Sequence, residues 1–190
     1  MRRPRSKTLF VSAVTALLLA ACGADTSVTE RQGEVRDAGA KVMPFDLDKT
    51  KHSFVKTETG GVQTVIALDP TDVEQVRLVR EHLEEISVEF AAGRFDDPTT
   101  IHGDDMPGVQ ELATGAADLK IIYREVEGGG EITYTTTVGA LVGHLHDWFD
   151  AQVSDHGSDA VSEPFGHTMT EEMWRAHHPG QPYPGESAED

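Results

Sequence analysis

The sequence has one cysteine, Cys22, among 190 residues, so no disulfide can form within the chain. The same count excludes a metal centre built from several cysteine thiolates and a redox-active cysteine pair. Long apolar runs are missing as well. A membrane-spanning helix needs about 20 apolar residues, and the one sustained apolar run covers only residues 9–21. The stability of the folded part must therefore come from an ordinary hydrophobic core.

The short apolar run belongs to a pattern that is typical of secreted proteins. Four basic side chains lie within residues 1–7, the apolar run follows, and the segment ends Leu19-Ala20-Ala21-Cys22. This ending resembles the lipobox of bacterial lipoproteins, which implies cleavage before Cys22 and transfer of diacylglycerol to its sulfur. Two acyl chains, such as palmitate, anchor a protein stably where one chain does not. We therefore predict an anchor at Cys22 in the cell envelope, outside the cytoplasm; an ordinary signal peptide with an incidental cysteine is the alternative.

Basic side chains are scarce, with 16 Lys and Arg against 33 Asp and Glu and a formal net charge of −17. Residues 1–21 hold four of the basic side chains and no acidic one, so the processed chain carries −21. Such a surface repels phosphate groups, which excludes nucleic acid as a partner and leaves membrane attachment to the acyl chains. It attracts metal cations and basic protein partners, although an acidic surface also serves solubility alone.

Composition divides the chain into four parts. Residues 1–21 form the predicted signal peptide. Residues 22–43 are polar and have no apolar period, which predicts a flexible tether. Residues 44–157 carry the apolar patterning of one folded domain. Residues 158–190 are acidic and rich in Pro, Gly and His, and we predict a mostly irregular tail.

The first half of the domain predicts two strands followed by a helix. Residues 52–68 have the pattern of a hairpin that turns around Gly60-Gly61. Asp69 is a suitable helix cap and Pro70 a suitable first helical residue. Spacings of three and four predict one apolar helical stripe, which consists of Val76, Val79, Leu83, Ile86 and Phe90.

The second half repeats this plan. A hairpin over residues 119–137 turns at the glycines 128–130, and a helix follows over residues 140–156. We predict an α+β fold in which two strand-strand-helix repeats form a mainly antiparallel sheet with two helices on one face. The inward side chains of the second helix are expected to be Leu141, Val142, Leu145, Trp148, Phe149 and Val153.

The stretch FDDPTTIHGDDMPG, residues 95–108, lies in the connector between the repeats, residues 95–118. Its aspartates, prolines and glycines favour turns, and Pro107 suits the start of a short helix. A purely structural connector leaves His102 and Met106 unexplained. An imidazole and a thioether four residues apart suit copper better than calcium or magnesium, so these two residues centre a predicted metal site.

Other histidines are candidates to complete that site, because the chain has nine. The candidates are His52 at the start of the first strand, His82 and His146 at the edges of the helical stripes, and His156 in the last helical turn. A helix C-cap is the alternative role of His156. His144 and His146 do not form a metal pair, because residues two apart on a helix point about 200° apart.

The tail offers a second group of soft ligands. If the tail is helical there, Met169, Met173 and His177 lie on one face. Thioethers with an imidazole favour copper(I), whereas an amphipathic helix that packs its methionines on the domain is the alternative.

One resemblance covers most of the domain, from about Met43 to Gly157. It rests on MPFDLDKTKHSFVKTETGGVQTV, IHGDDMPG and WFDAQVSDHG, which resemble small bacterial proteins, some of them labelled aspartate carbamoyltransferase. That enzyme family implies two α/β domains, an S-x-R-T-type carbamoyl-phosphate loop and an HP-x-Q element. The loop is missing, and the letters of the second element recur only in residues 178–181 of the tail. Because the acidic charge also opposes two anionic substrates, no catalytic residue is carried over.

Signatures of other enzyme classes are missing too. The chain has no GxSxG nucleophile motif, and its glycine clusters lack the Lys and Ser or Thr of a phosphate-binding loop. Our leading hypothesis is a lipid-anchored, non-catalytic binding protein whose ligand is unknown. A copper-binding protein that uses His and Met ligands is the second hypothesis, and an enzyme of unassigned chemistry is the third.

Overall fold

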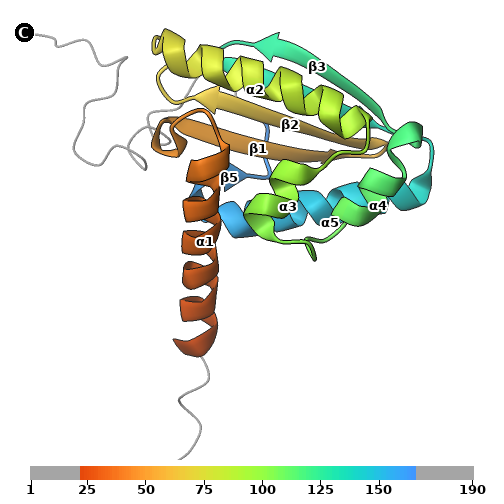
Figure 1. Ribbon diagram of the computed structural model, residues 1–190, viewed down its shortest axis with the longest axis horizontal. Helices are drawn as coiled ribbons and strands as arrows, with labels where there is room; N and C mark the ends of the chain where they lie inside the picture. The colour runs from red at the N-terminus through yellow and green to blue at the C-terminus, as the bar shows by residue number, and fades with distance from the viewer. Residues whose placement is uncertain (1–21, 166–190) are drawn as a thin grey trace, which may run out of the picture.

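The computed structural model describes residues 22–165, in which five strands form one sheet and helices pack against it (Figure 1). The strands are β1 Thr50–Thr57, β2 Gly60–Ala67, β3 Lys120–Val126, β4 Gly129–Thr135 and β5 Ala160–Val161. The α-helices are α1 Cys22–Val42, α2 Val73–Ala91, α3 Asp96–His102, α4 Val109–Thr114 and α5 Gly139–His156. Short 3-10 helices are η1 Leu47–Lys49, η2 Ala116–Asp118 and η3 Gly157–Asp159.

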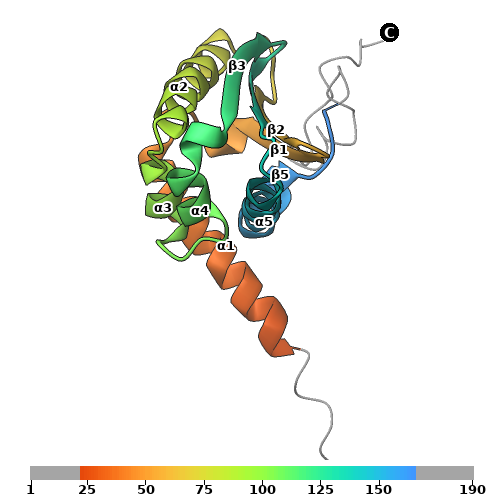
Figure 2. The same cartoon turned by 90° about the vertical axis from the view of Figure 1, so that its right-hand side faces the viewer.

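Two strand-strand-helix repeats, β1-β2-α2 and β3-β4-α5, make up most of this fold. The sheet order is β3-β4-β2-β1-β5, and only the β1–β5 pair is parallel among the strands of residues 22–165. Strands β2 and β4 join the repeats, with Gly61 opposite Tyr134. The two long helices of the repeats, α2 and α5, cover the same face of the sheet (Figure 2). The predicted α+β fold, a mainly antiparallel sheet with two helices on one face, is confirmed.

The hairpin turns fall slightly earlier than the glycine clusters predicted. They occupy residues 58–59 and 127–128. Gly61 lies instead inside β2, where a Cβ would overlap Cε2 of Phe149 on α5. This glycine therefore serves the close approach of α5 to the sheet rather than the turn.

Helix α2 and its cap lie three residues later than predicted. The carboxylate of Asp72, not that of Asp69, accepts a hydrogen bond from the backbone N–H of Gln75 (3.3 Å). Asp69 accepts from the backbone N–H of Thr71 (2.8 Å) and shapes the preceding turn. Val76 is only half-buried, whereas the rest of the predicted stripe is buried: Val79, Leu83, Ile86 and Phe90.

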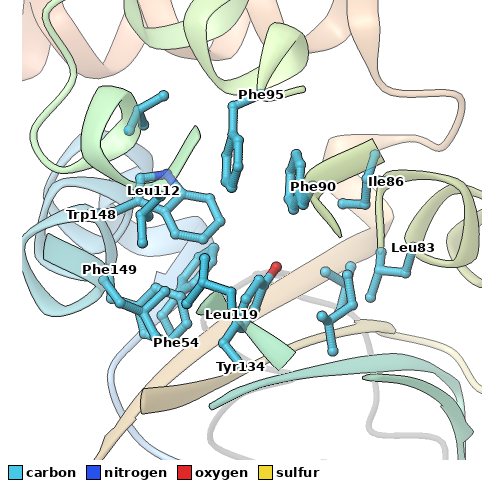
Figure 3. Packing of buried hydrophobic residues seen from close by; sticks show 14 of the residues in the cluster. Phe54, Leu83, Ile86, Phe90, Phe95, Leu112, Leu119, Tyr134, Trp148 and Phe149 are labelled. Atoms are coloured by element: carbon cyan, nitrogen blue, oxygen red, sulfur yellow. The ribbon is translucent and has the colours of Figure 1, made fainter. Parts of the chain in front are cut away.

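Six aromatic rings fill the space between the sheet, α2 and α5. We call them the aromatic core, which consists of Phe54, Phe90, Phe95, Tyr134, Trp148 and Phe149 (Figure 3). The Trp148 ring meets Phe90 and Tyr134 edge-on, with centroids 5.8 and 5.7 Å apart. The Tyr134 hydroxyl donates to Oε1 of Gln63 (2.7 Å), so the buried phenol is satisfied. This packing fixes both long helices on the sheet.

A helix, α1, occupies the segment that the sequence predicted as a flexible tether. Its second half packs on the domain through Val35, which is 1% exposed, while its first half projects away (Figure 1). Arg31 and Arg36 form ion pairs with Asp155 and Asp159 at the end of α5 and just after it. Because polar residues make many of these contacts, the sequence of α1 has no apolar period, and the pattern did not predict a helix there.

The connector between the repeats folds into α3 and α4, which lie beside α5 (Figure 2). Gly108 precedes α4 with a φ of 77°, and a Cβ there would overlap the backbone oxygen of His144. Only glycine therefore allows this close approach of the connector to α5. Helix α4 confirms the predicted short helix after Pro107, whereas α3 was not predicted.

The predicted tail is described only in its first residues. Residues 158–165 contain the end of η3 and the strand β5, which pairs with β1, rather than wholly irregular chain. The predicted signal peptide and the soft ligands Met169, Met173 and His177 lie outside the described residues.

Candidate functional site

A pocket lies between β1, α2, α3 and α5 on the helix-covered face of the sheet. Its cavity has a volume of about 50 Å³, which is room for a few water molecules or one small ligand. Apolar and aromatic side chains form most of the wall. Four histidines also line it, and we call it the four-histidine pocket after them: His52, His82, His102 and His156.

Each histidine reaches the pocket because of its place on its element. His52 shares the inward face of β1 with Phe54, since side chains alternate along a strand. His82 lies on the buried face of α2. His102 and His156 are the last residues of α3 and α5, whose C-terminal ends meet at the pocket.

His156 lies between two of the other imidazoles. Its ring is nearly parallel to that of His52, with centroids 5.3 Å apart, and meets the ring of His102 edge-on at 5.0 Å. Phe45 extends this row, because its ring centroid lies 6.0 Å from that of His52 and 5.7 Å from that of His82. The four histidines therefore belong to one connected wall.

The half-buried carboxylate of Asp155 orients His102. Its Nδ1 donates to Oδ2 of Asp155 (2.8 Å), because an ionised carboxylate only accepts hydrogen bonds. Nε2 of neutral His102 therefore carries no proton. Arg31 supports the pair by donating to the same Asp155 oxygen (2.7 Å) and to the backbone oxygen of His102 (2.7 Å). Burial raises the pKa of Asp155, but the hydrogen bonds from Arg31 and His102 outweigh it and lower that pKa overall.

The rings of His156 and His52 are oriented as well. Nε2 of His156 donates to Oε1 of Gln152 (3.0 Å), which leaves Nδ1 of neutral His156 unprotonated. His52 bonds with the backbone of Asp159. Nδ1 of His52 is buried and has no hydrogen-bond partner among residues 22–165, so Nε2 makes that bond and Nδ1 carries a free lone pair.

Burial keeps all four imidazoles neutral at pH 7. It lowers the pKa of His52 to about 4, with a further contribution from His82, and lowers the pKa of His82 itself to about 4. Burial also takes the pKa of His156 well below its ordinary value. The pKa of His102 falls for the same reason, although Asp155 opposes the shift. Neutral imidazole is the form that binds metals and accepts hydrogen bonds.

The structure brings together four of the six residues of the predicted metal site and separates the other two. Met106 is 4% exposed and packs in the hydrophobic core, because the turn after α3 directs it inward. Nε2 of His146 donates to the backbone oxygens of Thr57 (3.1 Å) and Gly60 (2.9 Å), at the far end of the first hairpin. Another methionine, Met43, lines the pocket instead, and the sequence had not indicated it.

Sequence reasoning also missed the polar residues that support the histidines. Asp155, Gln152 and Arg31 act through contacts between distant segments, and no spacing along the chain indicates such contacts. Asp97 contributes the one carboxylate among the described residues of the wall, and burial raises its pKa. Two acidic neighbours, Asp96 and Glu85, raise it further.

Residues 22–165 contain neither a preformed metal site nor a helix that could span a membrane. Within residues 22–165, no three His, Cys, Asp or Glu side chains are arranged to hold a metal ion. Over the same range, every helix is too short or too polar to cross a membrane.

No protein-family model, curated protein or solved structure matches the chain. Its function must therefore be argued from the pocket and the targeting pattern.

Proposed function

We propose that this protein is a lipid-anchored, extracytoplasmic binding protein whose ligand occupies the four-histidine pocket. The observation that carries the proposal is Nδ1 of His52, a buried lone pair with no partner among residues 22–165, in the wall of a cavity. An unsatisfied buried polar atom costs about 1–3 kcal/mol of stability. Three further neutral imidazoles line the same cavity, and apolar side chains would stabilise the fold better. Such a concentration of strongly shifted groups in one pocket is typical of functional sites.

The composition of the wall favours binding over covalent catalysis. The described wall has no Ser, Thr, Cys, Lys or Arg side chain, so it offers no hydroxyl, thiol or amine nucleophile. It also offers no permanent cation, since its histidines are neutral. Anionic substrates such as those of a carbamoyltransferase would find no countercharge there. A neutral or cationic ligand fits the wall better.

The targeting pattern supports the membrane anchor. A basic start and an apolar run lead to Cys22, the residue of the lipobox that would be lipidated, and the residues that follow belong to α1. At about 1.5 Å per residue, the 21 residues of α1 measure roughly 30 Å. Since the first half of α1 projects from the domain (Figure 1), it would act as a stiff spacer between the lipid and the pocket.

Cys22→Ala tests the anchor. Wild-type protein from a bacterial host should incorporate labelled palmitate and sediment with membranes, and the variant should do neither. Membrane association of the variant equal to that of the wild type would contradict the anchor.

His52→Phe tests the pocket, because it removes the free lone pair and keeps a flat ring. The wild-type protein should retain a small molecule or an ion in native mass spectrometry, and the folded variant should lose it. His144→Gln is the matched control, because His144 lies on α5 outside the pocket wall. Equal ligand retention by His52→Phe and the wild type would contradict the assignment.

A further inference from the structure

We propose that the four-histidine pocket binds a transition-metal ion of the borderline or soft class, copper or zinc, through ring nitrogens of His52, His102 and His156. This inference rests on the proposed function, because it names the class of ligand for the same pocket. It uses imidazoles from three separate elements, β1, α3 and α5, and involves neither Met106 nor His146.

Each of the three imidazoles is held by its other ring nitrogen. His102 donates to the Asp155 carboxylate, His156 donates to the amide oxygen of Gln152, and His52 bonds to the backbone of Asp159. Metal-binding histidines are typically oriented in this way, because the outer partner fixes the tautomer and makes the free nitrogen a better ligand. The arrangement therefore supplies three oriented, unprotonated nitrogens to one pocket.

The ring spacings suit a single ion. Metal–nitrogen bonds of about 2 Å in a tetrahedral site place neighbouring ring centroids about 5 Å apart. The His52–His156 and His156–His102 separations are 5.3 and 5.0 Å. The nitrogens do not yet converge, as residues 22–165 hold no ready three-ligand site. Binding therefore needs rotations of the imidazoles, and the adjoining cavity of about 50 Å³ provides space for them.

The contact between Gln152 and His102 is the one that must yield when the rings rotate. The Gln152 side chain interacts with both His102 and His156 in the metal-free arrangement. An ion bound to the free nitrogen of His102 would replace that contact, whereas the bond from Nε2 of His156 to Gln152 would remain and keep this ring oriented. The pocket therefore has a polar contact that can be exchanged for metal coordination without unfolding the wall.

The chemistry of the wall selects the class of ion. Imidazole nitrogen suits copper and zinc, and the thioether of Met43 adds a soft donor to the same wall. Calcium and magnesium require several oxygen ligands, whereas Asp97 is the one carboxylate in the described wall.

Equilibrium dialysis tests the inference. The processed protein, purified as the cell produces it and stripped with a chelator, is dialysed against copper(II), copper(I) under a reductant, zinc(II) or magnesium(II). We expect one copper or zinc ion per chain and no magnesium. Cobalt(II) should give the absorption spectrum of a nitrogen-ligated site, a readout that needs no variant and so no assumption about variant folding.

Variants then locate the ion. His102→Gln retains a donor for Asp155 and should lower the metal affinity by about 100-fold or more, since it removes a ligand. His144→Gln should leave the affinity unchanged. His177→Gln should also leave the affinity unchanged, which distinguishes binding in the pocket from binding by the soft ligands of the tail. Circular dichroism and urea denaturation establish that each variant is folded before its affinity is compared.

Three outcomes overturn the inference: no bound copper or zinc, equal affinity in folded His102→Gln, or loss of affinity in His177→Gln alone. Native mass spectrometry of the metal-free protein separates this failure from that of the proposed function. If it finds an organic molecule that His102→Gln fails to retain, the metal inference falls and the binding function stands. If the pocket retains neither an ion nor a molecule, both fall.

Discussion

The aromatic core and the four-histidine pocket are neighbouring regions between the same sheet and the same long helices, yet they are built in opposite ways. In the aromatic core, six large rings interlock and none is more than 4% exposed (Figure 3). In the pocket, four imidazoles take the place of apolar rings, and a cavity of about 50 Å³ remains between the side chains. The two regions share Phe54, Phe90 and Trp148, so they are contiguous.

The difference separates what holds the fold from what serves a ligand. Interlocked rings supply stability mainly through buried apolar area, although Nε1 of Trp148 is also buried without a hydrogen-bond partner among residues 22–165. Buried histidines lower stability unless each nitrogen is satisfied, and Nδ1 of His52 is not satisfied within residues 22–165. Natural proteins accept such losses at functional sites, where stability and activity are in conflict. Substitutions in the aromatic core should therefore lower stability most, whereas substitutions in the pocket should mainly change pH dependence and ligand affinity.

The largest effect is expected in the aromatic core. Phe149→Ala should lower the free energy of unfolding by about 3–5 kcal/mol, because it removes a fully buried ring outside the pocket wall and leaves a cavity. His82→Phe in the pocket should change that free energy by less than about 1.5 kcal/mol, because the ring is replaced by one of similar size. Urea denaturation followed by far-ultraviolet circular dichroism measures both. A loss in His82→Phe as large as in Phe149→Ala would contradict the separation of roles.

The second effect is a pH dependence that belongs to the pocket alone. His52 and His82 have folded-state pKa values of about 4, below the ordinary value of 6.5, so the unfolded chain binds protons that the folded chain does not. Stability is complete above pH 6.5 and falls as the pH drops toward 4. By pH 4.5 each of the two histidines should remove about 2 kcal/mol.

Comparison of pH profiles isolates this effect. Unfolding free energies of the wild type and His82→Phe should converge or cross between pH 7 and pH 4.5, with the variant losing about 2 kcal/mol less. Carboxylates such as Asp155 titrate at lower pH, and they are common to both proteins. Parallel profiles for the two proteins would show that His82 is not held neutral.

The third effect concerns ligand affinity rather than stability. Asp155→Asn should weaken binding in the pocket by about 10- to 100-fold, because an amide no longer fixes the Nδ1–H tautomer of His102. Asp150→Asn is the matched control, since Asp150 is an exposed carboxylate of α5 that pairs with Lys56 outside the pocket. Dialysis with the metal that the wild type retains gives both affinities. Equal weakening in the two variants would assign the effect to net charge.

The smallest effect is expected at His146, which the sequence predicted as a candidate ligand of the metal site. His146→Ala should lower stability by about 1 kcal/mol, because the backbone oxygens of Thr57 and Gly60 lose a shared donor. Ligand affinity should stay at the wild-type value. Calorimetric unfolding and dialysis of the same sample measure the two quantities, and a drop in affinity would place His146 in the site.

The sequence predicted the fold well because its signal is local. The stripe on α2 and the alternation along β1 define buried faces directly, and two such repeats imply a sheet with helices on one face. The cap of α2 and the two hairpin turns were predicted only approximately: the cap is Asp72 rather than Asp69, and the turns slightly precede the glycine clusters. These details depend on which of several suitable residues the backbone geometry selects.

Tertiary contacts explain what the sequence did not reveal. Four of the predicted histidines line one pocket, namely His52, His82, His102 and His156, but proximity in sequence favoured Met106 as a partner, and packing buried it elsewhere. The roles of Arg31 and Gln152 depend on where α1 and α5 meet α3, and no local pattern encodes that junction. Helix α1 was missed for the same reason, since polar pairs hold it.

The most direct test of the central claim, that the pocket presents neutral imidazoles with free nitrogens to a ligand, is nitrogen-15 NMR of the histidine rings at pH 7. We predict that His52, His102 and His156 each show one protonated and one bare nitrogen. The bare signals should shift when one equivalent of zinc is added, while those of His144 and His146 stay unchanged. Protonated pocket imidazoles at pH 7 would contradict the account, and bare nitrogens that no metal ion or retained molecule shifts would contradict it equally.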